Sequence, residues 1–196
     1  MDIEGTLRDL GPVDSAELIE VVLAQDDEAW KANQYRQQAY DVHTQTESLV
    51  MVFCDGWPEM EVSKEAAWDS LKETAVPLMR QIIDEFYPAG GTIIRAMAAK
   101  LKAGGIISPH RDTHPSFTHA HRIHIPITTN PGVRFMINGR PHRFKIGNAY
   151  EINNQMNHSV MNSGSEDRIT FIFDYVPPAE LARIQQKVNP QRTTAA

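Results

Sequence analysis

The sequence contains a single cysteine, Cys54, so no disulfide can form within the chain. Scarcity of cysteine is usual for proteins of a reducing compartment, and Cys54 is expected to be a small, buried, apolar residue. The first residues lack the order of basic, apolar and small residues that makes a signal peptide, and no run reaches the ~18 apolar residues of a membrane span. These absences predict a cytoplasmic protein.

Positive charge is also scarce, and the net charge is −6. A nucleic-acid-binding domain usually has a clustered basic face, so we expect neither nucleic acid nor membrane as a partner. The hydrophobic fraction of 41% and the charged fraction of 22% are ordinary for a globular protein. One local basic cluster is interpreted as a solvated hairpin: Arg134, Arg140, His142 and Arg143.

A chain of 196 residues suits one domain, which we place at residues 1–185. Residues 1–89 mix helical signals with short apolar runs and are expected to support the core. Residues 90–178 read as short strands separated by Gly, Pro and Asn, and are expected to form that core. Residues 186–196 have little to bury and are predicted to be a flexible tail.

Two helices and one strand are expected in the first half. Asp14 begins a segment that could cap a helix reaching Leu23. The apolar, β-branched residues 48–53 predict a strand. Helical spacing resumes after Ser63, a plausible N-cap, and Pro77 is expected to bend or split this second helix.

The second half predicts a mainly β (α+β) fold, a β-sandwich or jelly roll with helices packed against one sheet. Asn138-Gly139, between two apolar segments, is a strong signal for a two-residue hairpin. The strands are expected at residues 92–101, 121–128, 133–137, 141–145, 148–152, 157–162 and 168–176.

Five of the eight histidines lie between His110 and His124. Within this segment, His110 and Asp112 are two residues apart, so on a strand they would point the same way and could share a metal ion. The His-x-Asp pattern is weak by itself. With a distant histidine it would give a 2-His-1-carboxylate triad, which leaves open positions on an octahedral iron.

His158 is the candidate for the distant histidine, and Arg168 follows it by ten residues. If their strands form a hairpin through an odd-numbered loop at residues 163–167, both side chains face one side of the sheet. Arg168 could then bind a carboxylate of a metal-bound molecule. With an even-numbered loop, Arg168 would point away.

Arg122 and His124 share the face of one strand, opposite three isoleucines that must face the core. A cation and an imidazole in the middle of a strand favour a nearby anion, although an ordinary half-solvated sheet face remains open. His114, His119 and His121 fall in a predicted loop, where they either face the substrate or are merely solvated. Arg134 is a further candidate for contacting substrate.

Taken in order, these residues resemble the aspartyl/asparaginyl β-hydroxylase family over roughly residues 90–178, with a weaker similarity at Arg36 and residues 43–49. The residues that carry the resemblance are Ser108-Pro109-His110-Arg111-Asp112, Arg122-Ile123-His124, Asn157-His158, Arg168 and Phe171-Ile172-Phe173-Asp174-Tyr175. The loop between His110 and Arg122 is slightly longer than in the peptide-hydroxylating members.

The resemblance implies a double-stranded β-helix that uses Fe(II), 2-oxoglutarate and O2 to hydroxylate an unactivated carbon, releasing succinate and CO2. It implies iron ligation by His110, Asp112 and His158. It assigns the distal carboxylate of 2-oxoglutarate to Arg168, and the end near the metal to Arg122 with His124. We expect an amino-acid-like or peptidyl (Asp/Asn-type) substrate. The alternatives are a cupin-like metal enzyme of another class and a non-catalytic jelly-roll binding module.

Overall fold

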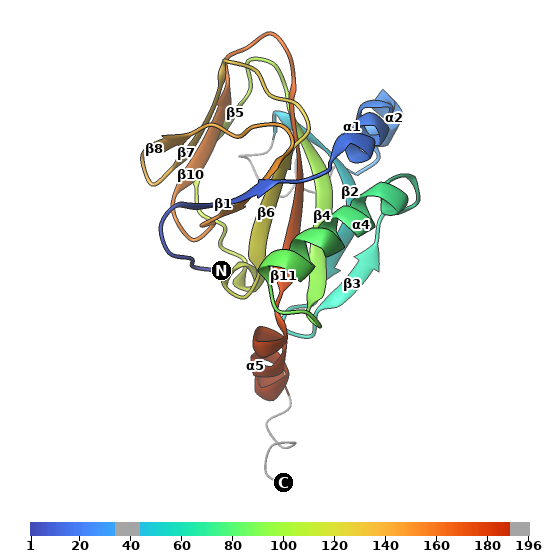
Figure 1. The fold of residues 1–196 in the computed structure, drawn as a ribbon, viewed down its shortest axis with the longest axis vertical. Helices are drawn as coiled ribbons and strands as arrows, with labels where there is room; N and C mark the ends of the chain where they lie inside the picture. Colours follow the sequence, from blue (N-terminus) through green and yellow to red (C-terminus); the bar gives the residue numbers. More distant parts are fainter. Residues whose placement is uncertain (34–43, 189–196) are drawn as a thin grey trace, which may run out of the picture.

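The computed structural model of the protein describes residues 1–33 and 44–188 (Figure 1). The helices are α1 (Ala16–Leu23), α2 (Asp27–Lys31), α4 (Trp68–Phe86) and α5 (Pro178–Val188). The strands are β1 (Leu7–Pro12), β2 (Thr46–Asp55), β3 (Glu61–Lys64), β4 (Thr92–Leu101), β5 (Ile106–His110), β6 (His121–Pro126), β7 (Val133–Ile137), β8 (Arg140–His142), β9 (Asn148–Ile152), β10 (His158–Asn162) and β11 (Arg168–Val176).

The strands form two antiparallel sheets that pack face to face. The larger sheet has the order β1-β9-β6-β11-β4-β2-β3, and the smaller has the order β5-β10-β7-β8. Leu101 and Ile152 of the larger sheet share one buried cluster with Phe135, Ile137 and Val160 of the smaller. The chain crosses repeatedly from one sheet to the other, which is the arrangement of a double-stranded β-helix, or jelly roll.

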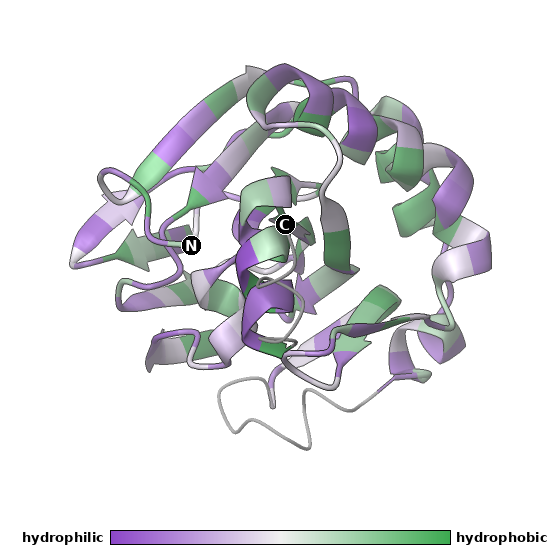
Figure 2. Ribbon diagram, turned by 90° about the horizontal axis from the view of Figure 1, so that it is seen from below, coloured by the Kyte–Doolittle hydropathy of each residue, from purple (hydrophilic) through white to green (hydrophobic). Residues whose placement is uncertain are grey.

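Helix α4 covers the opposite face of the larger sheet, beside α1 (Figure 1). Its buried residues recur every three to four positions, so one stripe of the helix faces the sheet. They join Leu49 and Met51 of β2 and Phe171 of β11 in the main core. Apolar and polar residues alternate along the ribbons in Figure 2, as expected for elements that bury one face.

Strand β11 lies near the middle of the larger sheet and is buried on both faces. Successive side chains of a strand point to opposite faces. Ile169, Phe171 and Phe173 belong to the core beneath α4. The alternate residues of the same strand, among them Arg168, Thr170 and Asp174, therefore face the space between the sheets.

The structure confirms the predicted fold class and most of the strand pattern. The predicted strands at residues 92–101, 133–137, 148–152 and 168–176 coincide with β4, β7, β9 and β11. Asn138 and Gly139 form the predicted hairpin turn, with positive φ angles of 49° and 74°. Pairing of Ile137 with Arg140 closes this turn.

Several predictions about local elements were wrong. The strand predicted at residues 141–145 ends at His142, since the following residues cross to the other sheet. Ser63 lies in β3 and caps no helix, and α4 begins only at Trp68. Of the two effects expected of Pro77, bending or splitting, the split does not occur, because α4 runs through it as one helix.

The hairpin suggested for the strands of His158 and Arg168 is also wrong. Strand β10 pairs with β5 and β7, whereas β11 pairs with β4 and β6 in the other sheet. Loop parity therefore does not decide whether the two side chains meet.

Strands β1, β3 and β5 and helices α2 and α5 were not predicted. Residues 186–188 complete α5, while residues 189–196 of the predicted tail lie outside the described residues, as do Arg36 and His43. Within residues 1–33 and 44–188, no helix is both long and apolar enough to cross a membrane.

Candidate active site

Three potential metal ligands converge where the end of β5 meets the start of β10. His110 and His158 are direct cross-strand partners, although they are far apart in the sequence. The Oδ1 atom of Asp112 lies 3.9 Å from Nε2 of His110 and 4.0 Å from Nε2 of His158. One ligand atom from each of the three residues lies within 4.8 Å of the others. Antiparallel pairing of two short strands thus assembles the group.

Backbone carbonyls fix the orientation of both imidazoles. Nδ1 of His110 lies 2.8 Å from the carbonyl oxygen of Ser108, and Nδ1 of His158 lies 3.0 Å from that of Met156. A carbonyl oxygen can only accept, so each Nδ1 carries the proton and donates it. Each Nε2 then keeps its lone pair toward the common point, as metal-binding histidines require.

Two imidazole nitrogens and one carboxylate oxygen are the donor set of the facial triad that binds Fe(II) in non-haem oxygenases. Three protein ligands are fewer than the six of an octahedral ion, so they fit a metal that keeps positions open for other ligands. Their convergence also counts against a non-catalytic jelly roll, in which these side chains have no reason to meet.

Arg122 holds the second oxygen of the candidate carboxylate ligand. Its Nη1 donates to Oδ2 of Asp112 over 2.8 Å, which leaves Oδ1 toward the histidines. Its Nε and Nη2 donate to the two oxygens of Asp174, each over 2.8 Å. Asp112 is thereby fixed by Arg122, a cation of the larger sheet that is itself held by Asp174 on the neighbouring strand.

Asp174 is fully buried and is the anchor of this arrangement. Burial raises the pKa of its carboxyl, but the nearby cations, Arg122 before Arg95, together lower it by more, and the net pKa lies below its ordinary value. Arg95 approaches Asp174 at 3.7 Å and donates to the hydroxyl of Ser116. The buried charges are therefore paired rather than isolated.

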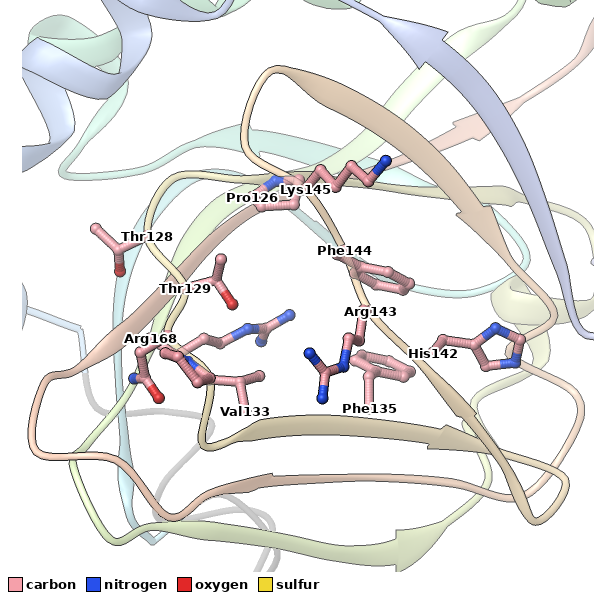
Figure 3. A pocket seen from close by; sticks show the side chains of 12 residues that line it. Pro126, Thr128, Thr129, Val133, Phe135, His142, Arg143, Phe144, Lys145 and Arg168 are labelled. Carbon is pink, nitrogen blue, oxygen red and sulfur yellow. The ribbon is translucent and has the colours of Figure 1, made fainter.

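A cavity of about 380 Å³ opens between the sheets (Figure 3). Arg168 lines one side and extends toward its centre, while Phe135 and Phe144 contribute aromatic walls. Twelve residues line the cavity, and none of them is acidic. The lining therefore suits an anionic ligand with an apolar middle.

Arg168 is buried, and within the described chain no ion pair to it is found. Burial lowers the pKa of its guanidinium to about 10, so it remains a cation at neutral pH. Two residues further along the same strand face, the hydroxyl of Thr170 is buried and makes no hydrogen bond to the described residues. A buried cation and a free hydroxyl on one face fit a carboxylate supplied by a ligand.

The ring of Phe135 lies between this cavity and the candidate metal ligands. It stacks on His158 with ring centroids 6.3 Å apart, and the guanidinium of Arg168 lies 5.8 Å from its centroid. His124 is buried beside it and contacts the rings of Phe135 and Phe144 edge-on. One aromatic ring thus separates the candidate iron ligands from the candidate carboxylate site.

The four residues considered as substrate contacts have diverse surroundings. Nδ1 of His114 lies 2.8 Å from the hydroxyl of Ser116, and its ring lies near Trp57 and Phe117. His119 pairs with Glu180 at 2.7 Å. His121 pairs with Glu151 at 2.5 Å, and its ring lies tilted against that of Tyr87, with centroids 4.5 Å apart. Arg134 is exposed on a strand whose neighbour Phe135 faces inward.

Asp174, Thr170, Arg95 and Arg143 were not recognised as possible site residues from the sequence. Asp174 carries the clearest signal in retrospect, because an aspartate inside the apolar run Phe171-Ile172-Phe173-Asp174-Tyr175 needs a buried partner. The sequence pattern predicts a solvated hairpin for Arg143, whereas in the structure this residue lines the cavity.

Comparisons with solved structures agree with this fold. A 2OG-Fe(II) oxygenase family oxidoreductase from Burkholderia pseudomallei is 13% identical, with a TM-score of 0.54 over 68% of this chain and 69% of the other. The non-heme monooxygenase ThoJ, in a nickel complex, is 14% identical, with a TM-score of 0.55 over 88% and 74%. The viral collagen prolyl hydroxylase of Paramecium Bursaria Chlorella virus-1, in a 2OG complex, is 11% identical, with a TM-score of 0.52 over 89% and 97%.

Fold and site together define a non-haem iron oxygenase built on a double-stranded β-helix. The family model for aspartyl/asparaginyl β-hydroxylases matches residues 15–178, so the chain belongs to that family. It is accordingly a 2-oxoglutarate-dependent non-haem iron hydroxylase with Fe(II), 2-oxoglutarate and O2 as its cofactor and co-substrates. A comparison with curated protein sequences gave no match.

Proposed function

We propose that this hydroxylase acts on an unactivated C–H bond of an amino-acid-like or peptidyl Asp/Asn-type substrate. The balanced reaction converts 2-oxoglutarate, O2 and R–H into succinate, CO2 and R–OH. His110, Asp112 and His158 would hold the iron. When bound, the iron supplies the activation of O2 that drives both the decarboxylation and the oxidation of the C–H bond.

The observation that carries the proposal is the buried cation of Arg168, which has no ion pair among the described residues and lies one aromatic ring away from His158. Arg168 and the hydroxyl of Thr170 would bind the distal carboxylate of 2-oxoglutarate between the sheets. Phe135 would pack against the carbon chain of the co-substrate, because it contacts both Arg168 and His158. This arrangement directs the keto-acid end toward the iron ligands.

The residues around the metal would keep its geometry constant. Arg122 holds Oδ2 of Asp112, so one carboxylate oxygen is available as a ligand. A role for Arg122 and His124 at the metal-side carboxylate of 2-oxoglutarate remains our prediction. So does a role for His114 in contacting substrate, since it lies in the loop that follows Asp112.

A succinate-coupled screen tests the proposal. The protein, loaded with Fe(II) and kept reduced with ascorbate, is incubated with 2-oxoglutarate, free amino acids and short peptides containing Asp or Asn. The expected result is succinate formed in a one-to-one ratio with a product heavier by one oxygen atom, for at least one substrate. Absence of succinate with every candidate, together with unchanged iron content in His110→Ala, would overturn the proposal.

A further inference from the structure

A second arginine faces the cavity of Arg168. Arg143 lies in the connection between β8 and β9, which crosses from the smaller sheet to the larger one. In Figure 3 the guanidinium groups of Arg143 and Arg168 extend into the same space from opposite sides. The two differ in burial, since Arg168 is buried and Arg143 is exposed. Arg143 therefore stands at the mouth of the cavity and Arg168 at its closed side.

The crossing segment that carries Arg143 is held in place on both sides. Phe144, the next residue, stacks between Phe135 and Tyr150, with ring centroids 4.8 Å and 4.6 Å away. The backbone N–H of Lys145 donates to the hydroxyl of Tyr150 over 3.0 Å. On the other side, Nε2 of His142 lies 3.2 Å from the hydroxyl of Thr6. These contacts fix the backbone of the segment beside the cavity, into which the side chain of Arg143 extends.

The residues that line the cavity include three cationic side chains and no carboxylate. The chain as a whole is acidic, yet no Asp or Glu occurs between Thr113 and Tyr150. Within the described residues, neither Arg143 nor Lys145 forms an ion pair with a carboxylate. Like-charged arginines that share a cavity without a protein anion repel each other. An anion between them would remove that repulsion, and a carboxylate has acceptor positions for two guanidinium groups.

We propose that Arg143 is a second binding residue for the distal carboxylate of the co-substrate, which it holds from the solvent side while Arg168 holds it from within. This inference rests on the proposed function, because it assumes that 2-oxoglutarate occupies the cavity. Arg143 determines specificity: it favours a 2-oxo acid with a second carboxylate over a 2-oxo acid of equal chain length without one. Lys145, at the same mouth, adds long-range attraction for the dianion.

The test compares 2-oxoglutarate with 2-oxopentanoate, which has the same keto-acid end but no distal carboxylate. Binding is measured by calorimetry on Fe(II)-loaded protein without oxygen, for the wild type, Arg143→Ala, Arg143→Lys and Arg140→Ala. Arg140 is the matched control, since it is an exposed arginine of β8 that does not line the cavity. Loss of one charge-assisted hydrogen bond predicts that Arg143→Ala weakens 2-oxoglutarate binding about tenfold. Binding of 2-oxopentanoate stays unchanged, and Arg143→Lys recovers part of the loss.

Two results would overturn the role of Arg143. One is a 2-oxoglutarate affinity in Arg143→Ala equal to that of Arg140→Ala. The other is an equal loss for both 2-oxo acids, which would indicate a displaced loop. Either result leaves the proposed function intact if Arg168→Ala still abolishes selective binding of 2-oxoglutarate. If the wild-type protein fails to bind 2-oxoglutarate at all, the proposed function and this inference fall together.

Discussion

Arg122 and Asp174 form a two-point ion pair inside the protein, with Nε–Oδ1 and Nη2–Oδ2 distances of 2.8 Å. The same guanidinium donates its Nη1 to Asp112. A candidate metal ligand in a loop is thus tied to a strand in the middle of the larger sheet. Because Asp174 is fully buried and binds Arg122 at two points, the position of Asp112 depends on the core as well as on its own loop.

Substituting the candidate ligands tests the metal site directly. His110→Ala, Asp112→Ala and His158→Ala should each reduce the iron bound per chain and abolish 2-oxoglutarate turnover, because each removes one of three protein ligands. Bound iron is measured by elemental analysis after dialysis. Asp84→Ala, an exposed carboxylate of α4, is the control and should retain full iron content. Full iron content in all three ligand variants would contradict the assignment.

Arg122→Lys should weaken iron binding although it replaces none of the three candidate ligands. Lysine keeps the charge but cannot reach Asp112 and both oxygens of Asp174 at once. Loss of a supporting contact to a ligand typically costs about 10–100-fold in metal affinity. Iron affinity is measured by competition with a chelator, with Arg140→Lys as the matched control. An affinity equal to that of the control would show that Asp112 needs no support from Arg122.

Thr170→Val separates binding of the co-substrate from folding. The hydroxyl is buried without a partner among the described residues, so its removal should leave the free energy of unfolding of the ligand-free protein unchanged or slightly higher. The KM for 2-oxoglutarate should rise roughly fivefold, corresponding to about 1 kcal/mol for one hydrogen bond. Urea unfolding and succinate kinetics give the two quantities. A clear loss of stability with an unchanged KM would show that the hydroxyl has a structural role.

Asp174→Asn should destabilise the protein by an amount that depends on pH. The ion pair keeps the pKa of Asp174 in the folded protein below its value of about 3.9 in the unfolded chain. A carboxyl with such a lowered pKa stabilises the fold above the unfolded pKa, and this stability is lost as pH falls through the folded pKa. The difference in free energy of unfolding between wild type and Asp174→Asn should therefore be constant from pH 8 to 5 and shrink below about pH 4.

Urea unfolding at several pH values measures this difference, with Asp84→Asn as the control for an exposed carboxylate. A gap between wild type and Asp174→Asn that stays the same down to pH 3 would mean that the charge of Asp174 contributes nothing to folding.

The sequence by itself was sufficient for most strands of the second half and for the choice of His110, Asp112 and His158 as candidate metal ligands. Short runs bounded by Gly, Pro and Asn located β4, β7, β9 and β11, and Asn138-Gly139 located the hairpin turn, because both signals act between neighbouring residues. The order of His110, Asp112, His158 and Arg168 was enough to indicate the family. The predicted start of α4 at Ser63 is wrong, because Ser63 belongs to the edge strand β3, which pairs with β2.

Only the tertiary structure decided which strands meet. The hairpin hypothesis puts His158 beside Arg168, yet the two strands lie in opposite sheets, and the ring of Phe135 lies between the two side chains. The contact of Arg122 with Asp174, fifty-two positions along the chain, depends on the pairing of β6 with β11 in the larger sheet. The direction of Arg143 into the cavity depends on the connection that crosses between the two sheets. Strand alternation fixes which side of a strand a residue faces. What lies across from that side is set by long-range pairing, which no local pattern encodes.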